Sequence, residues 1–159
     1  MKSVLYPGSF DPITKGHVDV ILRLRSIFDR VVVLVADSQQ KNYYFSNAER
    51  VQLIQGAIGN QKGISVRGSQ ILTITAAKEE GIRVVARSVR TSLDCEYEFT
   101  LADTNKKLDP DIETLFIMAD PKFAFISSTL VRELASYGAN TSEFVPENVA
   151  AAFQRRVKK

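Results

Sequence analysis

Apolar runs rich in β-branched residues alternate with segments of helical periodicity along the chain. The run Arg30–Ala36 is apolar from its second residue on, which is typical of a strand that is covered on both faces of a parallel sheet. In His17–Phe28, by contrast, Val18, Ile21 and Leu24 recur at mostly helical spacing. The first pattern predicts a buried strand and the second predicts an amphipathic helix.

The same patterns divide the remaining sequence into strands and helices. Strands are predicted at Ser3–Tyr6, Arg30–Ala36, Gly63–Arg67, Ile82–Ala86 and Glu113–Met118. Helices are predicted at His17–Phe28, Ser46–Ile58, Leu72–Glu80 and Ser92–Leu108, with two more that open at Ser127/Ser128 and at Pro146. This alternation predicts an α/β fold, a single Rossmann-like, doubly wound domain over residues 1–159 with a five-stranded parallel sheet and helices on both faces.

Ligands of such sheets bind beyond the carboxyl ends of the strands, near the point where the strand order reverses. Two loops longer than the others, Asp37–Phe45 and Ala119–Ile126, follow predicted strands. We therefore expect both loops to lie over the ligand crevice.

Composition places the chain among ordinary folded proteins, with 45% hydrophobic and 25% charged residues in a length of 159. The longest apolar runs are far too short to cross a bilayer, and the first residues hold no apolar core of signal-peptide length. A single cysteine, Cys95, cannot form an internal disulfide. We expect a cytoplasmic protein with no membrane partner.

The net charge of +3 arises partly at the end of the sequence, where Gln154–Lys159 carries four cations and no acid. A solvated helix end with cations at its negative pole explains this segment. Binding of nucleic acid needs a basic face with interleaved aromatic residues. Here the arginines lie apart and mostly beside acids, so we expect no nucleic-acid partner.

The segment Tyr6–His17 combines a strand end, a turn rich in glycine and proline, and a helix start. Backbone N–H groups and the positive helix end make such a junction an anion-binding site. Gly8 allows close approach of the backbone, Ser9 offers a hydroxyl and an N–H, and His17, the single histidine, lies on the first helical turn. A surface histidine beside ordinary turn residues is the alternative interpretation.

Further candidates follow the other predicted strands. Lys41, after the second strand, could reach a phosphate as a point charge. Arg87 and Arg90, after the fourth, could bind phosphate oxygens in bidentate fashion. Their alternative role is ion pairing with Asp94, Glu96 and Glu98.

Three consecutive hydroxyls, Ser127 to Thr129, open the helix after the fifth predicted strand. An ordinary N-cap is the alternative there, although a cap needs only one hydroxyl. The sequence has no Walker A loop, no GxGxxG fingerprint and no convincing Ser/His/Asp set, and one cysteine with one histidine excludes a Cys/His metal site. What remains is charge stabilisation on phosphates without a protein nucleophile, which suits direct phosphoryl or nucleotidyl transfer.

These segments also resemble a known family. Thr14–His17 (TKGH) resembles the (H/T)xGH signature of the nucleotidylyltransferase superfamily, and Ile126–Thr129 (ISST) resembles its second, phosphate-binding signature. The similarity to bacterial phosphopantetheine adenylyltransferases is closer and covers essentially the whole chain. The segments that carry it are Tyr6–Asp19, Phe45, Glu49-Arg50, Arg87–Arg90, Glu96–Glu98, Asn105 and Phe144–Asn148.

The resemblance implies an enzyme of coenzyme A biosynthesis. The 4′-phosphate of phosphopantetheine would attack the α-phosphate of ATP in line, giving dephospho-coenzyme A and pyrophosphate with Mg²⁺ assisting and with no covalent enzyme intermediate. The resemblance also implies a homohexamer, a dimer of trimers, and coenzyme A as a feedback ligand. Mg²⁺ would be held mainly by the phosphates of ATP, since no carboxylate cluster stands out as a metal site.

The same resemblance assigns roles to residues. The catalytic set would be His17, Lys41, Arg90 and Ser128, with His17 stabilising the α-phosphate in the transition state. ATP would be bound by Ser9, Phe10, His17, Ser88, Val89, Arg90, Glu98, Phe123, Ala124, Phe125, Ile126, Ser127, Ser128 and Thr129. Phosphopantetheine would be bound by Ser9, Lys41, Thr73 and Arg87.

The sequence departs from the family pattern at a few positions. Ser88 stands where the family has glycine, and it would be strained if that position required positive φ. Asn42 replaces a frequent second lysine, and Thr73 and Ala76 replace larger apolar residues. Two other functions remain open: a related cytidylyl- or adenylyltransferase with a different phosphorylated acceptor, and a nucleotide-binding sensor without chemistry.

Overall fold

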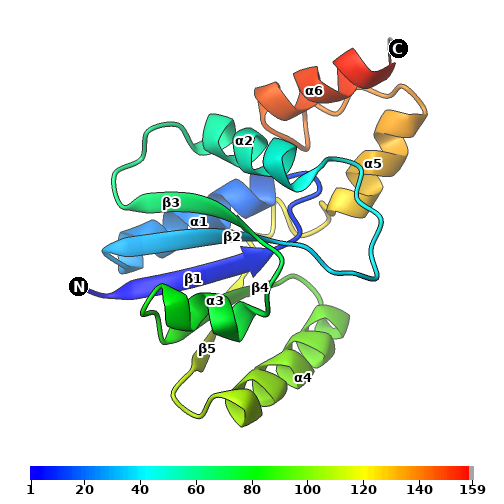
Figure 1. Ribbon diagram of the computed structural model, residues 1–159. Coiled ribbons are helices and arrows are strands. Elements are labelled where there is room, and N and C mark those ends of the chain that lie inside the picture. The colour runs from blue at the N-terminus through cyan, green and yellow to red at the C-terminus, as the bar shows by residue number, and fades with distance from the viewer. Residues whose placement is uncertain (158–159) are drawn as a thin grey trace.

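The computed structural model describes residues 1–157 and contains a five-stranded, all-parallel sheet with six helices (Figure 1). The sheet order is β3-β2-β1-β4-β5. The strands are β1 (Ser3–Gly8), β2 (Arg30–Ala36), β3 (Ile64–Ser69), β4 (Val84–Val89) and β5 (Glu113–Met118). The helices are α1 (Lys15–Ile27), α2 (Asn47–Ile58), α3 (Thr73–Glu79), α4 (Ser92–Leu108), α5 (Ser128–Ser136) and α6 (Glu147–Val157).

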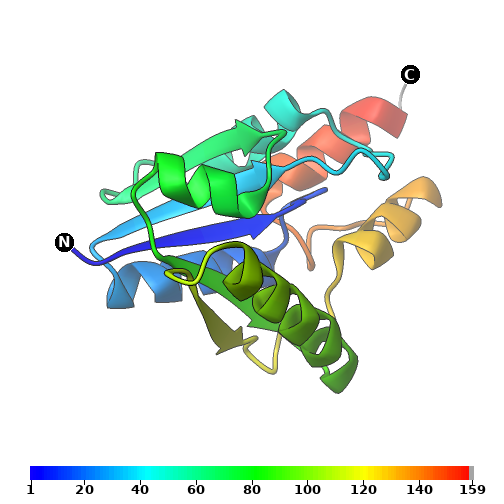
Figure 2. The same ribbon diagram turned by 60° about the horizontal axis from the view of Figure 1, so that its bottom comes forward.

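Helices cover both faces of the sheet, as the sequence predicts. Val31, Val33 and Val35 of β2 belong to a core shared with α1, α2, α5 and α6. Val32 and Leu34 point to the opposite face, where a second core includes α3. α4 lies on that second side, over β4 and β5 (Figure 2). The alternation along β2 thus explains why this strand is apolar at nearly every position.

Several predicted boundaries are confirmed. β2, α4 and β5 have the predicted ranges. Ser46 caps α2, because its side chain accepts a hydrogen bond from the Glu49 N–H while the Glu49 side chain accepts one from the Ser46 N–H. Gly81, which follows α3, has φ of 65° and ends the helix as predicted.

Three boundaries near the ligand edge differ from the prediction. β1 continues to Gly8, and α1 begins at Lys15, so His17 is the third residue of the helix. β4 runs to Val89 instead of ending at Ala86, because its backbone keeps pairing with β5 through the polar residues Arg87 and Ser88. Arg87, Ser88 and Val89 are therefore strand residues and do not lie in a turn after the strand.

The strand order reverses between β1 and β4, and the two strands separate there. β1 pairs with β2 along six residues, but its register with β4 is limited to Leu5 and Val85. Beyond that pair the carboxyl ends diverge, and Arg87 bridges them by donating from Nη1 to the carbonyl oxygen of Pro7 at 3.0 Å. The topology therefore opens a crevice where doubly wound sheets bind ligands.

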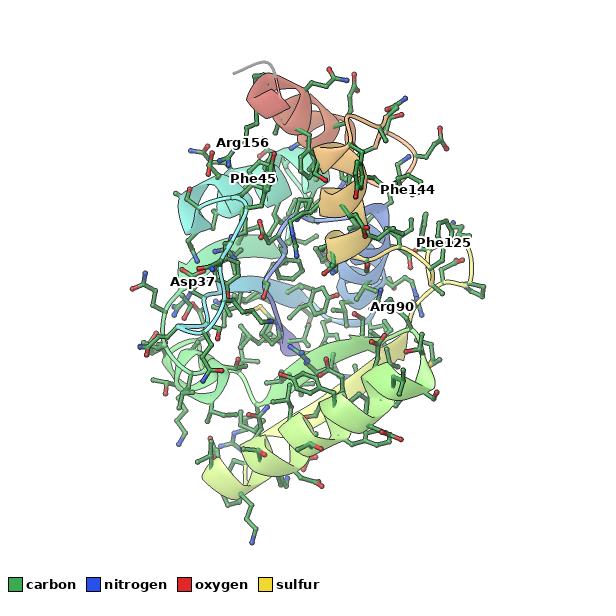
Figure 3. All side chains as sticks on the ribbon, turned by 90° about the vertical axis from the view of Figure 1, so that its right-hand side faces the viewer. Asp37, Phe45, Arg90, Phe125, Phe144 and Arg156 are labelled. Atoms are coloured by element: carbon green, nitrogen blue, oxygen red, sulfur yellow. The ribbon has the colours of Figure 1, made fainter. Side chains whose placement is uncertain are left out.

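The end of α6 is exposed at residues 154–156, with basic residues in its last turn as predicted, but one of these cations also has partners in the fold. Arg156 pairs with Glu49 of α2 and donates to the carbonyl oxygen of Tyr44, and its guanidinium lies 4.7 Å from the centre of the Phe45 ring (Figure 3). Hydrogen bonds from Arg156 and Ser46 lower the pKa of Glu49 to about 2. The predicted cations at 158–159 lie outside the described residues. Within residues 1–157, no helix is both long and apolar enough to cross a membrane.

Candidate active site

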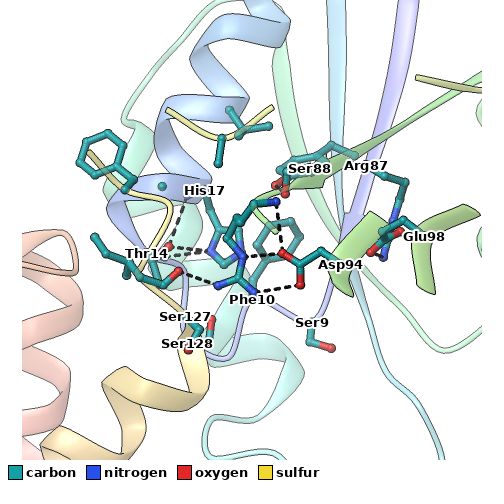
Figure 4. Close-up of a pocket in the computed structure, with 18 of the residues that line it drawn as sticks. Ser9, Phe10, Thr14, His17, Arg87, Ser88, Asp94, Glu98, Ser127 and Ser128 are labelled. Carbon is teal, nitrogen blue, oxygen red and sulfur yellow. Dashed lines mark hydrogen bonds and ion pairs between the residues drawn. The ribbon is translucent and has the colours of Figure 1, made fainter. Parts of the chain in front are cut away.

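A pocket opens at the carboxyl ends of β1 and β4, between the starts of α1 and α5 (Figure 4). Twelve of the predicted site residues line it: Ser9, Phe10, His17, Arg87, Ser88, Arg90, Glu98, Phe123, Ile126, Ser127, Ser128 and Thr129. The loop 119–126 thus borders the crevice as expected. No residue of the loop 37–45 lines this pocket; the loop follows β2 at the same edge of the sheet, and its position over the crevice stays a prediction.

Predicted residues outside the pocket lining fall into two groups. Lys41 lies in the exposed loop after β2, and Thr73 is the first residue of α3, after β3. Val89 is buried at the end of β4, while Ala124 and Phe125 lie in the loop before α5. Phe125 is exposed and its ring packs edge-on against Phe144 (Figure 3). The structure therefore brings together the histidine, arginine and hydroxyl groups but not the lysine.

Gly8 and Phe10 shape the turn after β1. A Cβ atom on Gly8 would lie 2.9 Å from the Phe10 ring, so glycine is required for this packing. Phe10 has φ of 46°, the one positive φ of a non-glycine residue in the described chain. Ser88 is thus free of the strain considered for it above.

His17 closes the first turn of α1 in a capping box with Thr14. The Thr14 hydroxyl accepts a hydrogen bond from the His17 N–H at 3.3 Å, and the Thr14 N–H donates to Nδ1 of His17 at 3.1 Å. Because Nδ1 accepts a hydrogen bond, the neutral ring carries its proton on Nε2. Nε2 has no hydrogen-bond partner among the described residues.

The imidazole is held in its neutral form. Burial, and then the nearby positive charge of Arg90, lower the pKa of His17 from 6.5 to about 4. Protonation of Nδ1 would also oppose the Thr14 N–H with a second donor. At neutral pH, His17 is therefore a hydrogen-bond donor through Nε2 and carries no charge.

Both arginines of the pocket are paired with carboxylates of α4. Arg87 forms a bidentate pair with Glu98, including an Nη2–Oε1 bond of 2.7 Å. Arg90 pairs with Asp94 at 3.1 Å and donates from Nη1 to the carbonyl oxygen of Ile126 at 3.0 Å. The alternative stated for these arginines, ion pairing, is thus confirmed for Glu98 and Asp94, while Glu96 pairs with neither arginine among the described residues. Each guanidinium is nonetheless on the pocket wall and can exchange a carboxylate oxygen for a phosphate oxygen.

The three hydroxyls at the start of α5 each have a structural partner. Ser127 caps the helix, Ser128 donates to the carbonyl oxygen of Pro12 at 2.7 Å, and Thr129 accepts a weak bond from an arginine one turn along. The backbone N–H groups of Ser128 and Thr129 have no hydrogen-bond partner among the described residues. These N–H groups at the positive helix end are therefore the donors available to an anion here.

Sequence reasoning gave no individual role to several residues that line the pocket, among them Tyr6 and Thr14. Thr14 orients His17, and a threonine three residues before the histidine is the spacing of a capping box, although glutamate or glutamine is usual in the histidine's place. Tyr6 forms a 3.1 Å hydrogen bond with Ser88 through their hydroxyls. Burial raises the pKa of Tyr6 to about 12, so the phenol stays protonated.

The assembled groups suit transfer at a phosphorus atom better than acid–base chemistry. A neutral Nε2–H, the backbone N–H groups at the start of α5 and two guanidiniums surround one pocket. Donors of this kind stabilise negative charge that develops on phosphate oxygens. Among the described residues, no group of three or more His, Cys, Asp or Glu side chains could hold a metal ion.

The comparisons with known proteins agree with this chemistry. The family profile described as cytidylyltransferase-like matches residues 5–134. The phosphopantetheine adenylyltransferase of Desulforudis audaxviator is 47% identical over 92% of this chain and 90% of its own length. The enzyme of the same name from Thermotoga neapolitana is 44% identical over 97% of this chain and 96% of its own.

A solved structure shows the shared fold. It is a candidate nicotinate-nucleotide adenylyltransferase from Vibrio parahaemolyticus, with a TM-score of 0.67 at 16% identity over 97% of this chain and 99% of its own. Identity of more than 40% to curated relatives along nearly the whole of both sequences is far stronger evidence than the fold. The chain belongs to the phosphopantetheine adenylyltransferase family.

Proposed function

We propose that this protein transfers the adenylyl group of ATP to 4′-phosphopantetheine, giving dephospho-coenzyme A and pyrophosphate. The curated relatives carry the name of this reaction along nearly their full length. The attacking group is a phosphate monoester whose second pKa is about 6, so it is a nucleophile at neutral pH and needs no general base. Attack on the α-phosphorus displaces pyrophosphate directly.

The observation that carries this proposal is the orientation of His17. Its Nδ1 is occupied by the Thr14 N–H, which leaves Nε2–H as a neutral donor on the pocket wall. On the proposed reaction this donor binds an α-phosphate oxygen as its negative charge grows. The N–H groups of Ser128 and Thr129, which have no partner within residues 1–157, bind the outer phosphates of ATP.

The remaining roles are part of the same proposal. Ser9, the backbone of Phe10, Ser88, Arg90 and Glu98 contact ATP from the pocket wall. Three other residues are also proposed to contact ATP, and each is next in sequence to a residue that lines the pocket: Val89, Ala124 and Phe125.

The acceptor site extends beyond the pocket. Arg87 of the pocket, with Lys41, binds the phosphate of phosphopantetheine, and Thr73 lines its arm. Lys41 and Thr73 follow β2 and β3, so they lie at the same carboxyl edge of the sheet as the pocket. A lysine on a long loop can reach a phosphate that the loop backbone does not touch.

Mg²⁺ is proposed to enter with ATP and to be held by phosphate oxygens and water. The two carboxylates of the pocket, Asp94 and Glu98, are engaged by arginines, which fits a metal carried mainly by the nucleotide. When bound, the ion neutralises charge on the phosphates.

We further propose that the protein acts in the cytoplasm and that coenzyme A is a feedback ligand. Coenzyme A contains a pantetheine part and a nucleotide part, as the two substrates do, and it would therefore bind in the same pocket.

A homohexamer, arranged as a dimer of trimers, is the proposed assembly. Large apolar side chains are exposed along α4 and at the end of the edge strand β5: Leu93, Tyr97, Phe99, Leu108 and Met118. α4 forms an outer side of the molecule in Figure 2. Exposed apolar side chains gathered in one region are typical of a contact between copies. Light scattering should give six times the mass of one chain, and a monodisperse monomer would contradict the assembly.

The function is tested by pyrophosphate release. Purified protein should release pyrophosphate from ATP with phosphopantetheine, and not with glycerol 3-phosphate or nicotinamide mononucleotide, while CTP should not replace ATP. His17→Ala should lower kcat by about 100-fold or more and leave the ATP affinity within a few-fold, since it removes a transition-state donor. Release with another acceptor and none with phosphopantetheine would refute the proposal. Equal losses of binding and rate in the variant would place His17 in ground-state binding instead.

A further inference from the structure

Arg50 of α2 is a buried cation to which the proposed reaction gives no part. Its side chain is 1% exposed and forms an ion pair with Asp37, the residue after β2. Nε donates to the carbonyl oxygen of Phe45 at 3.0 Å, and Nη1 donates to that of Ser9 at 2.7 Å. The ring of Tyr43 lies 4.1 Å from the guanidinium carbon. A cation so completely satisfied has a fixed position.

The bond to Ser9 fixes the plane of the peptide that joins Ser9 to Phe10. In a trans peptide the C=O and the N–H point in opposite directions. Arg50 does not line the pocket, whereas Ser9 and Phe10 do. The carbonyl is therefore turned toward the interior at Arg50, and the Phe10 N–H is turned away from it. That N–H has no hydrogen-bond partner among the described residues.

The positive φ of Phe10 belongs to the same arrangement. Rotation of the Ser9–Phe10 peptide changes φ of Phe10 and the direction of its N–H together. A phenylalanine at φ of 46° is in a sparsely populated region, so an unrestrained turn would relax by rotating that peptide. Relaxation would turn the N–H out of its present direction. An external restraint is needed, and Arg50 supplies one from the other side of the turn.

We propose that Arg50 is a positioning residue that holds the Phe10 N–H in place as a preorganised donor to a phosphate of the nucleotide. The inference rests on the proposed function for the identity of the ligand. Arg50 acts through the Ser9 carbonyl and touches no substrate. Arg50 also binds Asp37 and the Phe45 carbonyl, which are the two ends of the loop 37–45 that carries Lys41. It therefore fixes both ends of this loop relative to the turn at Ser9 and Phe10.

The sequence allows a direct measurement of this peptide. Ser-Phe occurs once, at Ser9-Phe10. Labelling serine with ¹³C at the carbonyl and phenylalanine with ¹⁵N gives a single NMR correlation, which reports the carbonyl bound by Arg50 and the N–H proposed as donor. In the wild type this signal should be single, and it should shift saturably as ATP is added.

Arg50→Lys is the test variant. A lysine ammonium keeps the charge but cannot hold two carbonyls and a carboxylate in the fork geometry of a guanidinium. The Ser9-Phe10 signal should broaden or double, and it should not shift at an ATP concentration that saturates the wild type. kcat/KM for ATP should fall about 100-fold, as expected for loss of one oriented donor. A folded variant with a wild-type signal and response would overturn the proposal.

Arg30→Lys is the matched control. Arg30 forms an ion pair with the carboxylate of Glu80 and donates to the Glu80 carbonyl oxygen, so its contacts are similar in kind to those of Arg50. It is the first residue of β2, however, whereas Asp37, the partner of Arg50, follows the last residue of that strand. This variant should keep the wild-type ATP response of the Ser9-Phe10 signal whatever its effect on thermal unfolding. Loss of the response in Arg30→Lys as well would show a general effect of destabilisation and overturn the proposal.

If Arg50→Lys does not fold, Asp37→Asn decides. Asp37 is 22% exposed, and its change to asparagine keeps the guanidinium but removes its ionic partner. A reduced shift on adding ATP supports the proposal, and an unchanged shift overturns it.

Failure of the proposed function can be told apart from failure of this inference. It would appear as no pyrophosphate release by the wild type with phosphopantetheine. A wild-type Ser9-Phe10 signal that ATP leaves unmoved, in a protein that does release pyrophosphate, refutes the inference alone.

Discussion

The charge state of His17 gives a prediction that can be measured without a substrate. The structure holds the imidazole neutral, with a pKa of about 4 in place of 6.5. One pKa unit corresponds to about 1.36 kcal/mol, so protonating the folded protein at His17 costs roughly 3 kcal/mol more than protonating the unfolded chain. The physical causes of the lowered pKa are burial and then the positive charge of Arg90.

The sign of the pH dependence follows from the lowered pKa. Above about pH 6.5 both states are neutral at His17, so the residue has no effect on the pH dependence of stability. As pH falls from about 6.5 to 4 the unfolded chain takes up the proton and the folded protein does not. The free energy of unfolding should therefore decrease through this window, with the full loss reached below about pH 4.

Two assays test this reasoning. His17 is the single histidine, so its Cε1–H NMR signal is unambiguous, and its titration midpoint should lie near 4. His17→Gln is the matched variant, because glutamine is a usual partner in a capping box and does not titrate. Urea unfolding of the wild type should lose up to about 3 kcal/mol more than that of the variant between pH 7 and 4. A midpoint at or above 6.5, or a neutral ring with its proton on Nδ1, would refute the assignment of Nε2–H as the donor.

Three further predictions address residues around the pocket. Lys41→Ala should raise the KM for phosphopantetheine with little change in the KM for ATP, and an unchanged acceptor KM would remove Lys41 from that site. Arg87→Ala should destabilise the protein by about 3 kcal/mol in thermal unfolding, because Glu98 is left buried without its partner, and adding Glu98→Gln should restore part of the stability but not the activity. Arg156→Ala should reduce the free energy of unfolding more at pH 7 than below pH 2, where Glu49 is protonated and only the contacts with Tyr44 and Phe45 are lost. Arg155→Ala should show no such pH-dependent loss, and equal effects of the two changes would contradict the pairing.

The sequence was sufficient to predict those elements whose position is determined by their own side chains. The buried strand Arg30–Ala36 is apolar on both faces, and Ser46 with Glu49 forms the predicted capping box. The end of β4 could not be predicted in this way. Its last residues include Arg87 and Ser88, whose polarity suggests a loop, but the backbone continues to pair with Phe116–Met118 whatever the side chains are. Pairing with a distant strand is not encoded in local composition.

The site was predictable at the level of which junctions meet, because parallel strands place all their carboxyl ends at one edge. The partners of each group were not predictable. Arginine spacing fits a phosphate or a carboxylate equally well, and only the position of α4 shows that Glu98 and Asp94 occupy the guanidiniums. The tautomer of His17 depends on the Thr14 N–H, a contact set by the first turn of α1.

The distribution of charge in the pocket suggests how binding and transfer are divided between its groups. Arg87 and Arg90 are each neutralised by a carboxylate. A phosphate that binds to them must compete with Glu98 and Asp94, which reduces the binding free energy that the arginines contribute. Nε2–H of His17 and the backbone N–H groups at the start of α5 have no partner in the described part of the chain, and they are neutral dipoles fixed by the fold. Such dipoles need no rearrangement as charge grows on the α-phosphate. On the proposed reaction, loss of an arginine should therefore act mainly on substrate affinity, and loss of the imidazole mainly on turnover.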